Sequence, residues 1–528
     1  MSRARKTPSV RRHPQTNASD LENGAVRRRK RGVVLLMVLV VIVGLAFSSY
    51  AFTTVMQAEQ DAAQMTSRRI QSRYLVDSGV EAARLFLSQT DAAIMEQGGV
   101  YNNATQFQSL IVFTDSDEQL QGYATFMAPA MDDLGMQSGF RYGLTDESTK
   151  LNLNVLPTLD QQAPGVAVQL LLALPGMTDE VADCILDYID ADDEPRDYGV
   201  EVEYYSGLSP PYAPTNGPLE SIEELLMVRG VTPELLFGYD DNHNGVIDGN
   251  ESSASGGISP DMALGWANYL TLWSKERNYT AEGLPRIYLN QPDMQTLYDE
   301  LSTVFSGEWA NFIVGMRIYG PYTGEDEPNA GVLPGVLDLT QEPTYDFNQV
   351  LDIVDAVVEV QFEGVDDPVI LSSPVRSELG LGLSLPMLLE NCTTVPADAI
   401  PGRVNIAQCP RAVMLGIPGM TEELADTIID RRELERDDED PNRDFETWLL
   451  VEGLVDLSTM RSLMPFVCVG GDVYRAEIVG YYNDGMAASR AEVVIDRTGA
   501  FPRIVFWRDK SHLPLGYDIE ALGTSLQQ

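Results

Sequence analysis

The sequence predicts an α+β fold: one long N-terminal helix and an antiparallel sheet, with a large, mainly helical domain inserted into the sheet. Three observations predict this class. An apolar run that starts at Val33 continues without Pro into an amphipathic segment that ends near Gln89. Short strand-like stretches lie near both ends of the chain. Between them, a Pro-Gly-Met-Thr signature occurs twice, as expected of repeated helical units.

The composition is that of a folded, acidic protein. The chain has 528 residues, of which 44% are hydrophobic and 8% aromatic, enough for one large core or several smaller ones. The net charge is −43, although residues 1–32 hold ten Lys or Arg and only two acidic residues. Such an acidic body repels nucleic acid and anionic membrane surfaces over most of its area. We therefore expect its partners to be cations or proteins.

The first element is a basic leader followed by a membrane-spanning helix. Residues 33–58 carry no charge, and about 20 apolar residues span a bilayer. Because residues 1–32 are basic, the positive-inside rule places the N-terminus in the cytoplasm and the later chain outside. A secretory signal peptide is the alternative. It is disfavoured because the apolar run is longer than a usual signal core and no small-x-small cleavage site ends it.

The outer elements predict a shared sheet. Residues 59–146 continue the helix and then form the first strands, "YATFMAPAM" and "FRYGLTDES". Residues 471–528 alternate apolar and polar positions across turn signals, which predicts a three-stranded antiparallel meander. If both groups of strands join one sheet, the residues between them are an insertion.

The insertion contains an internal repeat. "LPGMTDEVADCI" starts at Leu174 and "IPGMTEELADTI" at Ile417, and the Asn-bearing stretches "KLNLN" and "RVNIA" precede them. A third Asn-bearing stretch, "PRIYLN" from Pro285, indicates a degenerate copy. Pro and Gly between two short helices are typical of helix-hairpin-helix (SAM-like) units. We expect inserted units at 147–280, 281–400 and 401–470.

Two other functions fit the insertion less well. In DNA-binding versions of this motif, hairpin amides and basic side chains hold phosphates, whereas Asp179, Glu180, Glu422 and Glu423 begin the second helices here. We expect no nucleic-acid partner, and an exported DNA-binding or adhesion protein is the alternative. A tethered enzyme is the third hypothesis, but the sequence has no GxSxG, HExxH or phosphate-loop motif. We expect no enzymatic activity.

Four cysteines lie in the exported part: Cys184, Cys392, Cys409 and Cys468. Disulfides are permitted outside the cytoplasm, and a bridge between Cys392 and Cys409 would close a short loop. Four small buried thiols are the alternative, since sequence alone does not determine connectivity.

The stretch "DDNHNGVIDGNE" (240–251) has the spacing of a calcium loop. Such loops need oxygen ligands at positions 1, 3, 5, 7 and 9, Gly at 6 and Glu at 12. These positions are filled by Asp240, Asn242, Asn244, Gly245, the Val246 carbonyl, Asp248 and Glu251. "PELLFGY" is a candidate entering helix, but we expect no exiting helix from "SSASGGISP". A solvated acidic turn is the alternative.

A second acidic segment, "DADDEPRDYGVEVE", is also a candidate calcium site. Its oxygen ligands would be Asp190, Asp192, Asp193, Glu201 and Glu203. Their spacing matches no fixed pattern. The alternative is an acidic loop that caps its helix.

The chain resembles the general secretion pathway protein K family, the large minor pseudopilins of type II secretion systems. "RKRGVVLLMVLVV" is similar to a type IV pilin-like leader, and Met37 stands at the fifth mature position, where most pilins have Glu. "YGLTDESTKLNLN", "LPGM", "LDYIDADDEPRDYGVEVEYYSG" and "ESIEELLMVRGV" follow in the family's order. By this resemblance a prepilin peptidase would cut between Gly32 and Val33.

The resemblance implies a pilin-like fold with a helical insertion at the tip of a secretion pseudopilus. It implies other minor pseudopilins and the inner-membrane secretion platform as partners. It also implies single-pass insertion in the inner membrane, with the body in the periplasm, and a role in protein export across the outer membrane. An insertion of this size would obstruct stacking in a fibre shaft, and a tip subunit needs no carboxylate to pair with a subunit above it.

Overall fold

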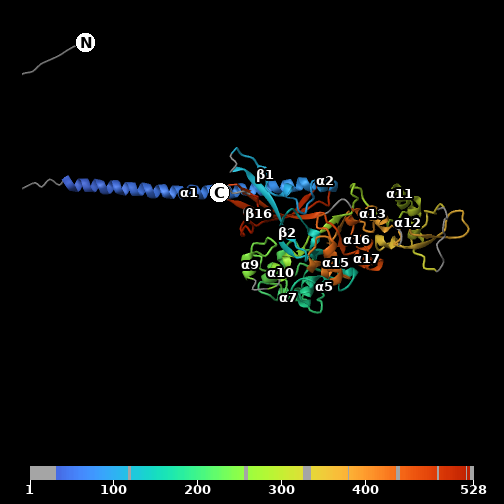
Figure 1. Ribbon diagram of the computed structural model, residues 1–528. Helices are drawn as coiled ribbons and strands as arrows, with labels where there is room; N and C mark the ends of the chain where they lie inside the picture. Colours follow the sequence, from blue (N-terminus) through green and yellow to red (C-terminus); the bar gives the residue numbers. More distant parts are fainter. Residues whose placement is uncertain are drawn as a thin grey trace, which may run out of the picture. The chain divides into compact units, whose positions relative to one another are not determined.

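The computed structural model describes residues 31–116, 120–254, 258, 260–324, 335–377, 380–435, 440–483, 487–518 and 520–523. The chain divides into two compact units, Met1–Thr66 and Ser67–Gln528. The described part of the first unit is helical. The second unit contains the sheet and the whole helical insertion (Figure 1).

The helix α1 (Arg31–Leu87) confirms the long N-terminal helix. In the described part of the chain it is the one helix long and apolar enough to cross a membrane. Its most apolar stretch buries nothing within the protein. The apolar side chains from Val33 to Met56 are therefore exposed in the isolated chain, as expected of a segment that is solvated by lipid.

The predicted shared sheet is present. Its strand order is β1 (Leu110–Phe113), β2 (Gly122–Met131), β15 (Val473–Tyr482), β16 (Ala488–Asp496) and β17 (Arg503–Asp509). β3 (Gln137–Tyr142) pairs with β2, and β4 (Thr145–Asp146) pairs with β15. β15, β16 and β17 form the predicted meander. Because β15 also pairs with β2, strands from before and after the middle section share one sheet.

The second half of α1 covers one face of this sheet. Val76, Val80 and Ala83 pack in one buried cluster with Phe126 of β2 and Ile478 of β15. The backbones approach closely because Gly480 has no side chain: a Cβ there would lie 2.6 Å from the Ser72 carbonyl oxygen. Next to this contact, the Ser72 and Ser489 hydroxyls share a buried hydrogen bond of 2.6 Å. These two contacts fix the position of the helix on the sheet.

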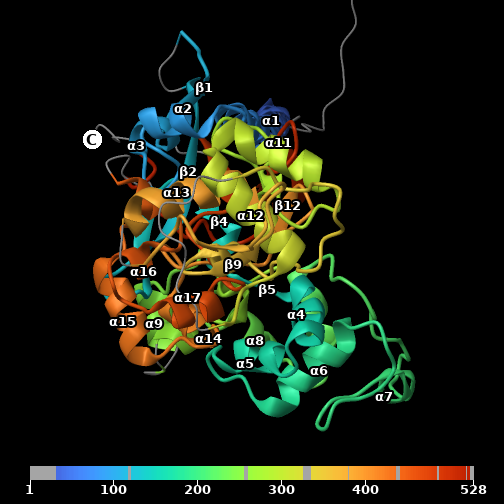
Figure 2. The same ribbon diagram turned by 90° about the vertical axis from the view of Figure 1, so that its right-hand side faces the viewer.

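The insertion consists of three successive segments, which follow one another from teal through yellow to orange in Figure 2. Each segment is closed by a short parallel strand pair. These pairs are β5 (Leu151–Asn152) with β6 (Leu270–Thr271), β8 (Ile287–Tyr288) with β11 (Cys392–Thr393), and β13 (Val404–Asn405) with β14 (Val467–Cys468). Each first strand comes from one of the three Asn-bearing stretches. The stretch from Pro285 therefore begins a segment with the same closure as the other two.

The first and third segments each contain two helix pairs with the same kind of turn. The pairs are α5 (Val166–Leu172) and α6 (Asp179–Ile189), η4 (Ile222–Met227) and α8 (Pro233–Phe237), α14 (Arg411–Gly416) and α15 (Glu422–Arg431), and α16 (Trp448–Val451) and α17 (Leu457–Leu463). Each turn contains a Gly at positive φ, namely Gly176, Gly230, Gly419 or Gly453. The N-caps that follow are Thr178, Thr232, Thr421 and Asp456. The left-handed Gly reverses the chain, and the cap satisfies an amide of the next helix.

The remaining elements complete the body. The other α-helices are α2 (Asp91–Glu96), α3 (Ala104–Phe107), α4 (Leu156–Gln162), α7 (Val202–Ser206), α9 (Gly249–Ala254), α10 (Pro260–Leu264), α11 (Met294–Val304), α12 (Gly307–Tyr319) and α13 (Leu381–Asn391). The other strands are β7 (Lys275–Arg277), β9 (Val357–Val360), β10 (Val369–Ser372) and β12 (Ala399–Pro401). One buried cluster extends from Leu151 to Val467, so the three segments share a core.

Candidate functional site

The predicted calcium loop, 240–251, connects α8 to α9. The expectation that no helix follows the loop is wrong, because Glu251 lies within the short helix α9. The stretch after Glu251 lacks a strong helical pattern, and Asp248 supplies the missing start signal, since its Oδ1 accepts a hydrogen bond of 3.1 Å from the Glu251 amide. The loop therefore has a short helix on each side.

Within the loop, the predicted ligands converge. Asp240 accepts hydrogen bonds from the Asn244 amide (3.0 Å) and the Gly245 amide (2.8 Å). Gly245 has φ of +81°, which only Gly adopts without strain. Asn242 Nδ2 donates to Glu251 Oε1 at 2.8 Å, which brings the third and twelfth loop positions into contact. The Val246 amide donates to Asn244 Oδ1 at 2.8 Å.

Two carboxylates of the loop are buried without an ion-pair partner among the described residues. Asp240 and Glu251 are 3% and 5% exposed. Burial raises the pKa of Asp240 to about 6 despite its two amide donors, and burial also raises the pKa of Glu251. Asn242 Oδ1 is buried without a hydrogen-bond partner among the described residues. An oxygen-binding cation would satisfy this oxygen and offset both carboxylates, so the donor set fits calcium.

The second acidic segment is built around a buried carboxylate. Glu201 is 5% exposed, and neither of its carboxylate oxygens has a partner in the described part of the chain. Burial and then the charges of Asp187, Asp190, Asp193 and Asp192 raise the pKa of Glu201 to about 7. Asp190 Oδ1 is also buried and unpartnered. Glu203, in contrast, is exposed on α7.

Asp187 also belongs to this site, although it was not among the ligands predicted from the sequence. It is fully buried, and its Oδ1 pairs with Arg196 Nη1 at 2.7 Å. Arg196 also pairs with Asp190 at 2.5 Å. Asp183, Asp187 and Asp190 follow a four-then-three spacing that places them on one face of α6, and this spacing could have identified the additional carboxylates.

Neither segment forms a tight all-carboxylate cluster. Within the described ranges, no group of three or more His, Cys, Asp or Glu side chains is placed to hold a metal ion. The loop relies on amide and carbonyl oxygens besides its carboxylates, and Arg196 occupies the carboxylates of Asp187 and Asp190. The unpartnered oxygens of Asn242, Asp190 and Glu201 are the atoms that fit an oxygen-binding cation in these two sites.

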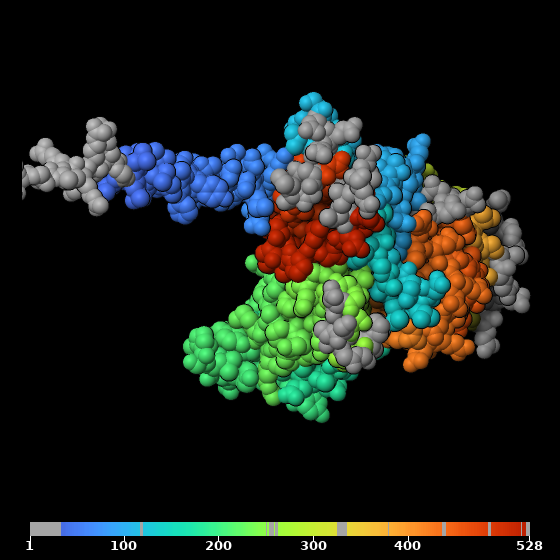
Figure 3. All heavy atoms as spheres, turned by 60° about the vertical axis from the view of Figure 1, so that its left-hand side comes forward, coloured from blue at the N-terminus to red at the C-terminus, as the bar shows by residue number. Residues whose placement is uncertain are grey.

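Hydrogen bonds also connect the predicted calcium loop to the sheet. Arg490 of β16 donates to the carbonyl oxygens of Asn242 (2.6 Å) and His243 (2.8 Å). Lys510 donates to the His243 carbonyl at 2.7 Å. Figure 3 shows the C-terminal strands directly against the segment that contains α9 and α10. Sequence reasoning missed these contacts because Arg490 lies 248 residues from Asn242.

The predicted processing site lies at the start of α1. Gly32 and Val33 lie in the first turn of α1, and residues 1–30 of the leader lie outside the described residues.

Cys392 and Cys409 are both free and buried, so this structure does not contain the predicted bridge. Each thiol fills its own part of the shared core, and burial raises the pKa of both. The alternative of small buried residues describes them.

Comparisons with known proteins agree on one family. The family model for type II secretion system (T2SS), protein K, matches residues 149–237. A putative type II secretion system protein K of Escherichia coli strain K12 is 24% identical over 220 residues, which cover 40% of this chain and 61% of that protein. The resemblance to the general secretion pathway protein K family is thus confirmed. The aligned part spans less than two thirds of the E. coli relative.

A solved structure also matches. It is a chain of the GspK-GspI-GspJ complex from the type 2 secretion system of enterotoxigenic Escherichia coli. The TM-score is 0.36 and the sequence identity 13%, with 86% of this chain and 98% of that chain covered.

Proposed function

We propose that this chain is a minor pseudopilin that stands at the tip of a type II secretion pseudopilus and supports protein export across the outer membrane. The observation that carries the proposal is the protein K match over residues 149–237. That segment forms most of the first inserted segment and lies in the interval between β4 and β15. In this role the chain is a structural component of an assembly and not an enzyme.

The architecture supports a position at the tip. Residues 147–472 lie between adjacent strands β4 and β15, so their whole bulk is added at one place in the sheet. Identical shaft subunits would have to accommodate that bulk at every repeat. Position 37 is Met and supplies no carboxylate for an adjacent subunit's N-terminal amine. Other minor pseudopilins and the inner-membrane platform are the proposed partners.

The membrane placement follows from α1 and the leader. We propose that α1 crosses the inner membrane once, with the N-terminus in the cytoplasm and the body in the periplasm. A prepilin peptidase would cut between Gly32 and Val33.

We propose calcium as the metal of the inserted domain. The loop would bind it through the carboxylates of Asp240, Asp248 and Glu251, the amide oxygens of Asn242 and Asn244, and the Val246 carbonyl. Glu201, with Asp190, Asp192 and Asp193, would form a second site. Bound calcium would neutralise buried carboxylates and hold each loop in one conformation. Extracellular modules bind calcium with Kd of about 10⁻⁴ to 10⁻³ M.

The left-handed Gly in the turn of each helix pair supports the alternative of an exported DNA-binding or adhesion protein that uses helix-hairpin-helix units. α6 and α15 nevertheless begin with Asp179, Glu180, Glu422 and Glu423, where phosphate would have to approach. We propose that the pairs serve as packing modules. A gel shift at low salt tests this, and retardation of DNA there would favour the alternative.

Export itself tests the main proposal. In a strain that lacks this gene, the full chain is expected to restore secretion through the type II system. A variant with Val40→Arg and Val41→Arg, which disrupts the spanning segment, is expected not to restore it. If the strain secretes normally without the gene, the proposed role is wrong.

A further inference from the structure

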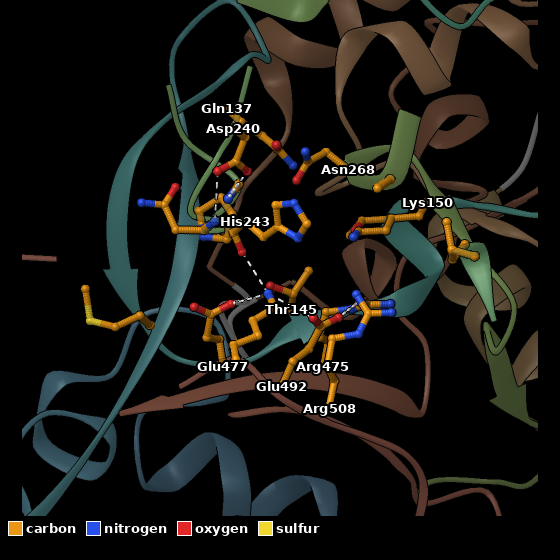
Figure 4. Close-up of a pocket in the computed structure, with 18 of the residues that line it drawn as sticks. Gln137, Thr145, Lys150, Asp240, His243, Asn268, Arg475, Glu477, Glu492 and Arg508 are labelled. Carbon is orange, nitrogen blue, oxygen red and sulfur yellow. Dashed lines mark hydrogen bonds and ion pairs between the residues drawn. The ribbon is translucent and has the colours of Figure 1, made fainter. Parts of the chain in front are cut away.

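A small cavity lies between the sheet and the calcium loop (Figure 4). Its volume is about 110 Å³, which is room for several waters or for one small organic ion. The walls include Arg475, Glu477 and Glu492 of the sheet, His243 of the loop, and Lys150 just after β4. Residues of the sheet and residues of the first inserted segment therefore line the same cavity.

Three of the other wall cations have carboxylate partners, and Arg141 donates instead to the backbone carbonyl oxygens of Pro129, Tyr101 and Leu144. Arg475 pairs with Glu147 at 2.6 Å and also with Glu492. Lys510 pairs with Glu477 at 2.9 Å and with Glu492 at 2.8 Å. Arg508 pairs with Glu223 at the outer rim. The charges of Glu147 and Glu492 attract Lys150, but among the described residues neither carboxylate forms an ion pair with it.

Lys150 is the exception. It is 7% exposed, and among the described residues no group accepts a hydrogen bond from its ammonium or lies in ion-pair contact with it. Burial and the charge of Arg475 lower its pKa to about 8, so the side chain still carries its charge at neutral pH. A buried ammonium without a hydrogen-bond acceptor is costly, and an anion in contact with it would reduce that cost.

Two uncharged groups face the same space. The His243 ring stacks on Phe237, with centroids 4.8 Å apart, and its nitrogens have no hydrogen-bond partner in the described part of the structure. Gln137 Oε1 is buried without a partner, and its amide can turn to present its NH₂ group instead. One positive charge with N–H donors beside it is the recognition pattern for a carboxylate.

We propose that this cavity binds a small monovalent carboxylate through the Lys150 ammonium, with the His243 imidazole and the Gln137 amide as additional hydrogen-bond donors. Lys150 is the wall cation whose charged group has no hydrogen-bond acceptor among the described residues, and one ammonium can bind one carboxylate. The cavity size restricts the ligand to a few heavy atoms, such as acetate. The site does not depend on the secretion role proposed above.

Thermal unfolding of the full chain in detergent tests the site, with sodium acetate compared with sodium chloride at equal ionic strength. Acetate is expected to raise the Tm saturably above the chloride series. Lys150→Met is expected to weaken apparent acetate affinity at least tenfold. Lys275→Met is the matched control, because that side chain is 44% exposed and lies 3.7 Å from Asp496; its acetate response is expected to equal the wild type.

A second variant keeps the test decisive if Lys150→Met does not fold. Gln137→Leu removes one donor from a different wall and is expected to weaken acetate at least threefold. The proposal is overturned if acetate and chloride give the same Tm series. It is also overturned if both variants respond to acetate as the wild type does, or if phosphate stabilises in a Lys150-dependent manner while acetate does not.

Discussion

At the scale of single residues, Glu201 shows how a buried carboxylate makes the stability of the protein depend on pH. Its pKa is raised from 4.5 to about 7, chiefly by burial. The folded state therefore binds a proton more tightly than the unfolded state does. The contribution of Glu201 to stability is fully present below pH 4.5 and is lost as the pH rises through about 7, where Glu201 must ionise without a partner.

The first prediction concerns this residue. In chelator, the Tm of wild-type protein is expected to fall more steeply between pH 4.5 and 7 than that of Glu201→Gln, which cannot ionise. Asp146 and Asp240, whose pKa values are raised to about 6, contribute the same slope to both proteins and cancel in the comparison. Glu203→Gln is the exposed control. Parallel Tm curves for wild type and Glu201→Gln would contradict the prediction.

Gly480 provides a second prediction, for the contact between α1 and the sheet. A Cβ at this position would lie 2.6 Å from the Ser72 carbonyl oxygen and 2.8 Å from the Val76 amide nitrogen. Because both atoms belong to the backbone, Gly480→Ala is expected to lower the free energy of unfolding by about 1–3 kcal/mol. Urea unfolding measures it. Gly470→Ala has open space around it and should change little; equal effects would refute the explanation.

Sequence spacing identified Asp240, Asn242 and Glu251 as neighbours because loop positions two, nine or eleven residues apart are linked by a short chain. It did not identify Lys150 or Arg490. Their neighbours lie far away in sequence, and they are brought together only when β4 joins β15 and β16 packs on the loop. Long-range contacts of this kind leave no local pattern.

At the scale of elements, the loop 240–251 with α8 and α9 is where the calcium proposal can be tested. The third prediction is that calcium binds the wild-type protein in calorimetry and raises its Tm. Glu251→Gln is expected to weaken binding at this loop at least tenfold, since it removes a bidentate ligand. Asp241→Asn is the matched control, because Asp241 is an exposed, non-ligating position of the same loop.

The result of that experiment can separate the two metal sites. If Glu251→Gln and Glu201→Gln each remove one of two calorimetric transitions, both sites bind. If calcium leaves the Tm of the wild-type protein unchanged, the metal proposal is wrong, whereas the fold and the protein K relationship would stand.

Long elements were predictable and short ones were not. α1 and the strands β15, β16 and β17 are long enough to repeat their helical or strand periodicity several times, so the pattern of apolar residues is clear. The closing strands β6, β11 and β14 have two residues each and no period to detect. Their partners are set by the packing of the helices between them. The short helix α9 was missed for the same reason.

At the scale of the whole molecule, the chain combines a basic leader, an apolar helix and an acidic body. The fourth prediction is that mature protein begins at Val33 when the chain is expressed with a prepilin peptidase. Gly32→Leu should block that cleavage, because the residue at the cut site must be small. Mass spectrometry of the intact protein measures both. A mature wild-type protein that retains Met1 would contradict the pilin-like interpretation.

The plan of the whole molecule was predictable because its two sheet-forming regions differ in pattern from the region between them. The pairing of β2 with β15 then makes the middle section an insertion into one sheet. What sequence could not predict is that the three inserted segments share one core, since buried side chains from Leu151 to Val467 meet only through tertiary packing.

The proposed position at the tip can be tested by locating this chain on an assembled pseudopilus. Gold labels attached to a tag in the inserted domain would be located by electron microscopy on fibres that also contain the major pseudopilin. We expect label at one end of each fibre and none along its length. Label distributed along the shaft, or absent from fibres that still assemble and support export, would contradict it.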